Sequence, residues 1–214
     1  MANALRGSEV MAKQYGGHGS IHKPTGQDAT SWFVFTCGHC GRDGSAAVVA
    51  FYGPQAGQIT RWLQCPTCGE GSVESDGPVP YMYPGVAPGP AIEGLPKEVA
   101  DAYGEARRCM SVNAFTACEG LCRKILMHVA VEKGAKEGES FASYVTHLAD
   151  SGYVTPPMKP WVDLIRQHGN EAQHLLPPTN KSRAEATLMF TAELLRLTYE
   201  MDHMAKKYAP PTKP

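Results

Sequence analysis

Two short stretches, FVFTCGHCGRDG at residues 33–44 and WLQCPTCGEGSV at residues 62–73, decide how the N-terminal part of this chain folds. Each contains a Cys-x-x-Cys pair followed by a glycine, and 24 residues separate the two pairs. A tight turn lets both sulfurs of a pair face one ion, and the glycine relieves steric strain where the turn closes. Four thiolates are a common ligand set for a tetrahedral structural Zn²⁺. We therefore predict one structural Zn²⁺ held by Cys37, Cys40, Cys65 and Cys68.

The segments around the cysteine pairs are short and rich in β-branched and aromatic residues, which is typical of strands. They cover 32–36, 46–52, 59–64 and 72–74. A metal-free redox pair is the alternative, but thioredoxin-type Cys-x-x-Cys motifs occur singly in a βαβ setting. The pattern predicts a small β zinc ribbon over residues 29–76.

Other side chains of this segment receive structural interpretations. His39 would be a fifth ligand, so we expect it to be exposed rather than bound to the metal. The aromatic residues Trp32, Phe51 and Trp62 can stack on bases. In so small a unit, we expect them to form the core instead.

The composition excludes several classes of protein. Lys plus Arg number 20 and Asp plus Glu number 21, so the chain has no global basic field for coating a polyanion. Seven cysteines are an odd number, which argues against a closed disulfide framework. The apolar runs are too short to span a membrane, and the first residues lack a signal-peptide core. We expect a cytoplasmic protein.

Shifts in composition divide the chain. Residues 1–28 have no periodicity and predict a flexible N-terminal arm. Residues 77–96 contain six prolines and four glycines, which predicts an extended, semi-rigid linker. Residues 97–208 have helical patterning, and 209–214 form a C-terminal tail.

Five helical segments with short connections follow the linker, so the predicted fold class is α+β: a small β zinc ribbon, then an all-α five-helix bundle. Ser140 is a predicted N-cap, and Ser182 with Glu185 forms a capping-box pattern. Cys118 and Cys122 share an apolar helical stripe, which favours core packing over metal binding.

The segment WVDLIRQHGNEAQH at residues 161–174 contains three polar residues spaced one helical turn apart, Arg166, Asn170 and His174. An arginine, a carboxamide and a histidine on one stripe can hold a phosphate and move a proton. The alternative is a buried polar network that fixes helix register. The spacing alone favours this alternative slightly.

The stretch RQHGNEAQH resembles the signature of the family named domain of unknown function 4145, whose helices carry an Arg-x-x-Gly-Asn-x-x-x-His element. The resemblance covers residues 97–208 and fits an N-terminal zinc ribbon. That family is similar to the HEPN helical domains of prokaryotic defence and restriction systems, many of which are dimeric, metal-independent ribonucleases.

The resemblance implies a HEPN-like bundle, a homodimer and RNA or another nucleic acid as a partner. It implies that His174 is the acid/base group, that Arg166 stabilises the phosphorane charge and that Asn170 orients one of them. In the nuclease pattern the arginine stands where this chain has Gly169, and the nearest arginine here lies one turn earlier.

Three functions follow: a metal-independent endoribonuclease, a non-catalytic nucleic-acid or restriction-complex accessory module, and a protein-interaction adaptor with a structural zinc site. The near-zero net charge favours the adaptor, whereas the stripe of Arg166, Asn170 and His174 favours the first two.

Overall fold

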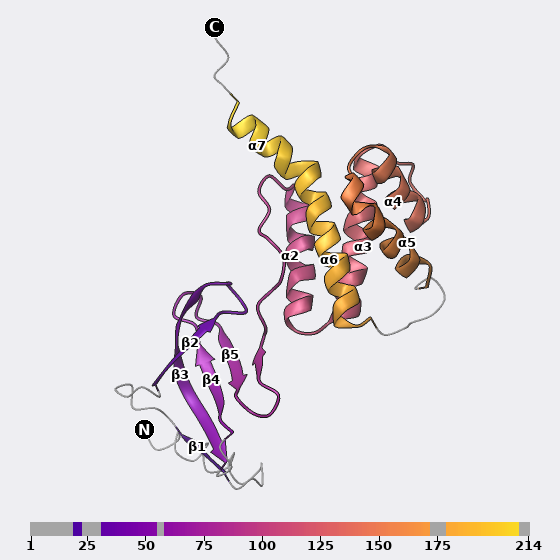
Figure 1. The fold of residues 1–214 in the computed structure, drawn as a ribbon. Coiled ribbons are helices and arrows are strands. Elements are labelled where there is room, and N and C mark those ends of the chain that lie inside the picture. Colours follow the sequence, from indigo (N-terminus) through magenta and orange to yellow (C-terminus); the bar gives the residue numbers. More distant parts are fainter. Residues whose placement is uncertain (1–18, 23–30, 55–57, 172–178, 210–214) are drawn as a thin grey trace. The chain divides into compact units, whose positions relative to one another are not determined.

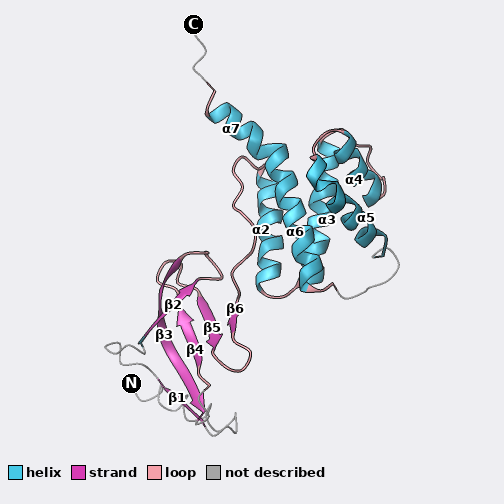
Figure 2. Ribbon diagram, in the orientation of Figure 1, coloured by secondary structure: helices cyan, strands magenta, loops and turns pink. Residues whose placement is uncertain are grey.

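A computed structural model describes most of the chain, in two compact units (Figure 1). The described residues are 19–22, 31–54, 58–171 and 179–209. The described residues of the first unit, Met1–Ala87, form a β-sheet, and those of the second, Pro88–Pro214, are mainly helical (Figure 2).

The described part of the first unit contains a six-stranded antiparallel sheet. Its strands are β1 (Gly19–His22), β2 (Trp32–Thr36), β3 (Asp43–Pro54), β4 (Thr60–Gln64), β5 (Gly71–Ser75) and β6 (Tyr81–Tyr83). The strand order is β1-β3-β4-β5-β6, and β2 also pairs with β3. The 12-residue β3 pairs through Ala47 with Trp32 of β2 and with Gln64 of β4, so β2 and β4 lie on its two sides.

One face of the sheet carries a small apolar core. Because successive side chains of a strand point to opposite faces, Phe33 and Phe35 lie on the face opposite Trp32 and Val34. The buried residues of this core are Phe35, Cys37, Ala46, Val48, Leu63 and Cys65. Half-buried Phe33, Phe51 and Met82 pack against them.

The α+β layout agrees with the sequence, but the small zinc ribbon predicted for residues 29–76 is wrong. The sheet extends from Gly19 to Tyr83 and has two strands outside that range. The physical reason is the length of β3: its C-terminal end pairs with β1 at residues 51–54, beyond the stretch paired with β2. At the other edge, β5 pairs with β6.

The Pro/Gly-rich segment 77–96 is divided between the two units, and each half makes contacts within its own unit. β6 belongs to the sheet, and a Cβ at Gly38 would come within 2.6 Å of the Gly85 carbonyl oxygen. Further along, the hydroxyl of Tyr103 donates to the Pro90 carbonyl and Arg107 donates to that of Pro88. These contacts account for the order of a segment that has few backbone donors.

The described residues of the second unit form five helical segments, the number predicted. They are α2 (Lys97–Ser111), α3 (Phe115–Glu132), α4 (Phe141–Asp150), α5 (Lys159–Glu171), and α6 (Lys181–Leu195), which continues through the π-helical η3 (Arg196–Glu200) into α7 (Met201–Lys207). A short 3₁₀ turn, η2 (Pro156–Met158), precedes α5. Cys118 and Cys122 are fully buried in the core, as predicted.

The predicted N-cap is found at the start of α4 but not at the start of α6. The side chain of Ser140 accepts a hydrogen bond from the Ser143 amide, so the predicted N-cap of α4 is confirmed. The capping box predicted at Ser182 is wrong, because the side chain of Asn180 accepts from the Arg183 amide instead. Asparagine is among the best N-caps.

None of the helices in the described ranges combines the length and the apolar composition that crossing a lipid bilayer requires.

Candidate metal centre

The two cysteine turns have the same backbone geometry. In the first, the amide of Cys37 donates to the Arg42 carbonyl and that of Gly41 donates to Cys37. In the second, Cys65 and Gly69 make the corresponding bonds, to Glu70 and Cys65. Gly41 and Gly69 have φ values of +69° and +78°, the left-handed region that glycine adopts without a steric penalty.

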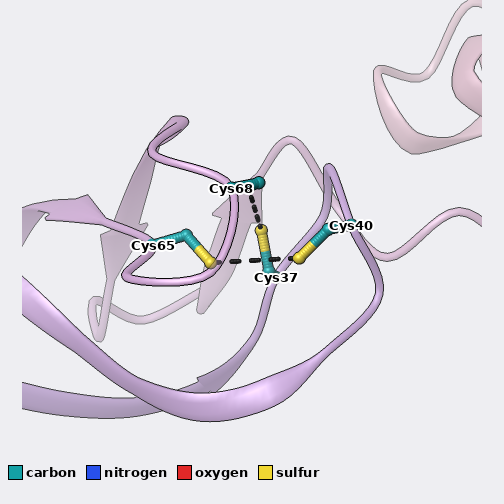
Figure 3. A group of neighbouring side chains, drawn as sticks. All are labelled: Cys37, Cys40, Cys65 and Cys68. Carbon is teal, nitrogen blue, oxygen red and sulfur yellow. Dashed lines mark hydrogen bonds between the residues drawn. The ribbon is translucent and has the colours of Figure 1, made fainter.

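The sheet brings the two turns together. One turn joins β2 to β3 and the other joins β4 to β5, and β3 pairs with β4. The sulfur of Cys37 lies 3.8 Å from that of Cys68, and Cys40 lies 3.9 Å from Cys65 (Figure 3). All four sulfurs lie within 4.8 Å of one another. The predicted ligands thus form a cluster that is compatible with a single metal ion.

The members of the cluster differ in exposure. Cys37 and Cys65, the first cysteines of the pairs, are buried in the core of the sheet, whereas Cys40 and Cys68 are exposed. The site is therefore supported from the core and opens towards solvent on the side of the second cysteines.

The backbone also tunes the thiols. The amide of Cys68 points at the sulfur of Cys65 and lowers the pKa of Cys65 to about 6. Burial raises the pKa of Cys37. A thiolate, and not a thiol, is the metal ligand, so turn amides aimed at sulfur favour the ligating form.

His39 lies between the cysteines of the first turn and is exposed, as predicted. Its Nε2 lies 3.0 Å from the carbonyl oxygen of Gly71 and donates to it. The bond joins the first turn to the start of β5. The described geometry gives His39 a role in holding the two turns together.

The predicted aromatic core is only partly correct. Phe51 is half-buried and packs against the core, but Trp32 is 55% exposed and Trp62 is 37% exposed. Both tryptophans lie on the other face of the sheet. Strand alternation in the sequence could have indicated this. Leu63 and Phe35 take the inner positions, so Trp62 and Trp32 on the same strands face outwards.

The side chains of the three predicted catalytic residues are outside what the structure describes. The backbone of α5 includes positions 166 and 170, but the side chains of Arg166 and Asn170 are not described. His174 lies outside the described residues. The three therefore stay a prediction.

The sequence did not predict a partly buried polar cluster between α3 and the start of α6. Arg183 donates to both oxygens of the Glu119 carboxylate, at 2.9 and 2.8 Å, and Thr179 donates to one of them. Burial lowers the pKa of the nearby Arg123 guanidinium, which also lies over the Phe141 ring. No motif around Glu119 indicates its partner, because Arg183 lies 64 residues further along the chain.

No curated protein and no solved structure matches this chain. Part of the chain matches a protein family described as a domain of unknown function, DUF4145. The match spans residues 104–210, half of the 214 residues and most of the helical unit. The resemblance indicated by the Gly-Asn-x-x-x-His element is thereby confirmed, and the chain belongs to the DUF4145 family.

Proposed function

We propose that the four cysteines hold one Zn²⁺ and that the metal is structural. Four sulfurs placed about 2.3 Å from a tetrahedral Zn²⁺ lie roughly 3.8 Å apart. The separations of 3.8 and 3.9 Å between cysteines of different turns fit that geometry. Four thiolates leave no coordination position for a substrate or a water, so this site would supply stability and not Lewis-acid chemistry.

We further propose that the chain is an interaction protein, in which the metal-held sheet presents a binding surface and the helical DUF4145 domain forms a separate unit. The closed four-thiol cluster carries this proposal. A metal held by four thiolates has no catalytic role, so we assign the function to the surface of the sheet that the metal stabilises. The charge of the sheet unit supports a protein partner over a nucleic acid. Residues 31–87 contain Arg42 and Arg61 as their only Lys or Arg side chains, against Asp43, Glu70, Glu74 and Asp76.

The zinc part of the proposal is tested by elemental analysis of the purified chain. We expect about one Zn per chain, and fewer than one in Cys65→Ser. The matched control is Cys109→Ser, which changes a half-buried cysteine outside the cluster. Wild-type protein that contains no zinc after expression in zinc-supplemented medium would contradict the site.

The interaction part is tested by binding assays at low salt. We expect the zinc-loaded chain to leave single-stranded and double-stranded RNA uncleaved and unbound, because the acidic sheet unit repels phosphate. Salt-sensitive RNA binding would contradict the adaptor function and favour a nucleic-acid module instead.

A second candidate, a metal-independent ribonuclease, is favoured by one observation. The backbone of α5 is helical through Glu171, so positions 166 and 170 lie one turn apart on one side of that helix. With His174 as acid/base and Arg166 stabilising charge on the phosphate, the chain would cleave RNA through attack of the 2′-hydroxyl.

This candidate is tested with RNA in the presence of a chelator. Cleavage by the wild type that is lost in His174→Ala and Arg166→Ala would establish it. The matched controls are His128→Ala and Arg108→Ala, which change exposed residues on other helices. Circular dichroism distinguishes lost chemistry from lost folding.

A further inference from the structure

The outer face of the sheet, opposite the core, carries a row of exposed aromatic side chains. Residues directly opposite each other on paired strands share a face. Trp62 pairs with Val73, and Val73 pairs with Tyr83, so these three follow one another across β4, β5 and β6. Tyr81 lies two residues from Tyr83 and on the same face.

On the same face, strands β2 and β3 extend this row towards the other edge of the sheet. Trp32 pairs with Ala47, which in turn pairs with Gln64, two residues from Trp62. Trp32 and Val34 therefore lie on the outer face with Trp62. We call the exposed members of this set the aromatic face; they are Trp32, Val34, Trp62, Tyr81 and Tyr83.

Exposed tryptophan and tyrosine side chains are well suited to binding a partner. Tryptophan and tyrosine remove more apolar area from water on binding than most residues, and they are enriched in the energetic centres of interfaces. The sheet has a small core on its inner face, and yet both of its tryptophans lie outside it. Contiguous exposed apolar patches on a protein surface mark interaction sites.

The charges around the aromatic face indicate which partner fits. On strands β2 to β6, the positions on this face include Asp43 and no lysine or arginine. Arg61 lies on the inner face, where it forms ion pairs with Glu74 and Asp76. Phosphate groups would meet no cation on these strand positions, whereas a cationic side chain would meet favourable potential and aromatic rings.

We propose that the aromatic face docks a segment of a partner protein that carries arginine or lysine among apolar side chains. The apolar side chains pack on Trp62, Val73 and Tyr83, and the cations lie over the rings and towards Asp43. This docking surface rests on the interaction function proposed above, and it specifies the surface and the chemistry of the partner.

The experiment uses the zinc-loaded full chain and a displayed library of random 12-residue peptides. We expect the selected peptides to be enriched in arginine or lysine together with aliphatic or aromatic residues. The dissociation constant of a selected, dye-labelled peptide is then measured by fluorescence anisotropy. Trp62→Ala is expected to weaken binding about tenfold or more, as for a central interface residue.

The chain offers a matched control, Trp161 on α5, which is 39% exposed against 37% for Trp62. Trp161→Ala is expected to leave the dissociation constant within about twofold, because surface residues outside an interface contribute little. Trp32→Ala provides a second test of the face if Trp62→Ala lowers the thermal stability of the sheet.

The possible outcomes separate the two proposals. Peptides whose binding is unchanged in both Trp62→Ala and Trp32→Ala would overturn the docking surface and leave the interaction function standing. Selected peptides dominated by acidic residues would overturn the proposed charge of the partner. Failure to select any peptide, or single-stranded RNA that binds in a Trp62-dependent manner, would overturn both proposals.

Discussion

The two units of this chain differ in what holds them together. Among the described residues, the helical unit buries a core of 25 apolar side chains, whereas the sheet unit buries six, two of which are the cysteines Cys37 and Cys65. A small unit cannot bury enough apolar surface to offset its conformational entropy, and a metal or disulfide then supplies the difference. The four-cysteine cluster is therefore part of the sheet's small core, whereas the helical unit has a large apolar core of its own.

The largest expected effect is the loss of the metal. Structural Zn²⁺ contributes an apparent ~10–16 kcal/mol in zinc-finger peptides, more than the whole stability of a typical domain. We expect chelation, or Cys65→Ser, to unfold the sheet unit while the helical unit stays folded. Hydrogen exchange will detect this as lost protection in β2 to β5 with protection kept in α2, α3 and α6.

Acid should act in the same direction as chelation. Thiolates must stay deprotonated to bind metal, so metal affinity, and with it the stability of the sheet, falls as the pH is lowered. The turn amide of Cys68, which lowers the pKa of Cys65 to about 6, favours the ligating form of that thiol. Cys109→Ser serves as the control for Cys65→Ser. If chelation unfolds both units equally, the stability of the sheet does not depend on the metal more than that of the helical unit does.

The second effect concerns the buried ion pair of the helical unit. Glu119→Gln removes the carboxylate charge that accepts two hydrogen bonds from the partly buried Arg183. Losing a hydrogen bond to a charged group costs about 1.5–3 kcal/mol. We expect urea denaturation to show a loss of this size in the helical transition and none in the sheet transition.

Two further variants isolate the cause. The exposed pair Lys97–Asp101 is an i,i+4 pair on α2, and Asp101→Ala should cost at most about 0.5 kcal/mol. The double variant Glu119→Leu/Arg183→Met removes both charges and should recover much of the loss. A double variant no more stable than Glu119→Gln would contradict this reading.

The third effect concerns the close approach between the first cysteine turn and the segment after β6. A Cβ at Gly38 would meet the backbone carbonyls of Pro84 and Gly85. Backbone cannot yield as a flexible side chain can, so Gly38→Ala should cost about 1–3 kcal/mol, the range for overpacking. The measurement is the midpoint of the sheet transition in the zinc-loaded protein.

The control is Gly44→Ala in β3, where a Cβ would meet nothing within 4 Å. It should leave the sheet as stable as the wild type or slightly more so, because alanine restricts the unfolded chain. Equal losses for the two variants would show that the contact with Pro84 and Gly85 does not matter.

Local chemistry was predictable from the sequence, and pairing partners were not. The cysteine turns follow from spacing and glycine placement within a few residues. Helix positions follow from the 3.6-residue period, which also gave the buried stripe containing Cys118 and Cys122. These features depend on near neighbours in the chain, where the physical rules are strong.

What the sequence did not reveal depends on long-range partners. The extent of the sheet depends on β3 pairing with β1 and on β5 pairing with β6, and neither the arm nor the Pro-rich segment carries a strong strand pattern. The outward position of Trp32 and Trp62 depends on register, since a shift by one residue exchanges the two faces. The Glu119–Arg183 pair joins helices that are distant in sequence. Its members look like ordinary surface charges until the helices are packed.

The smallest effect decides between the two caps of α6. Asn180 accepts a hydrogen bond from the Arg183 amide, whereas Ser182 is exposed and lies within the helix. Asn180→Ala should therefore cost about 1 kcal/mol of the free energy of unfolding, and Ser182→Ala should cost close to nothing. Because the cap acts only on its own helix, the loss should appear in the helical transition, with the zinc-dependent transition of the sheet unchanged. A larger loss in Ser182→Ala would mean that α6 begins at the capping box that the sequence suggests. A shift of both transitions in Asn180→Ala would mean that the two units do not unfold separately.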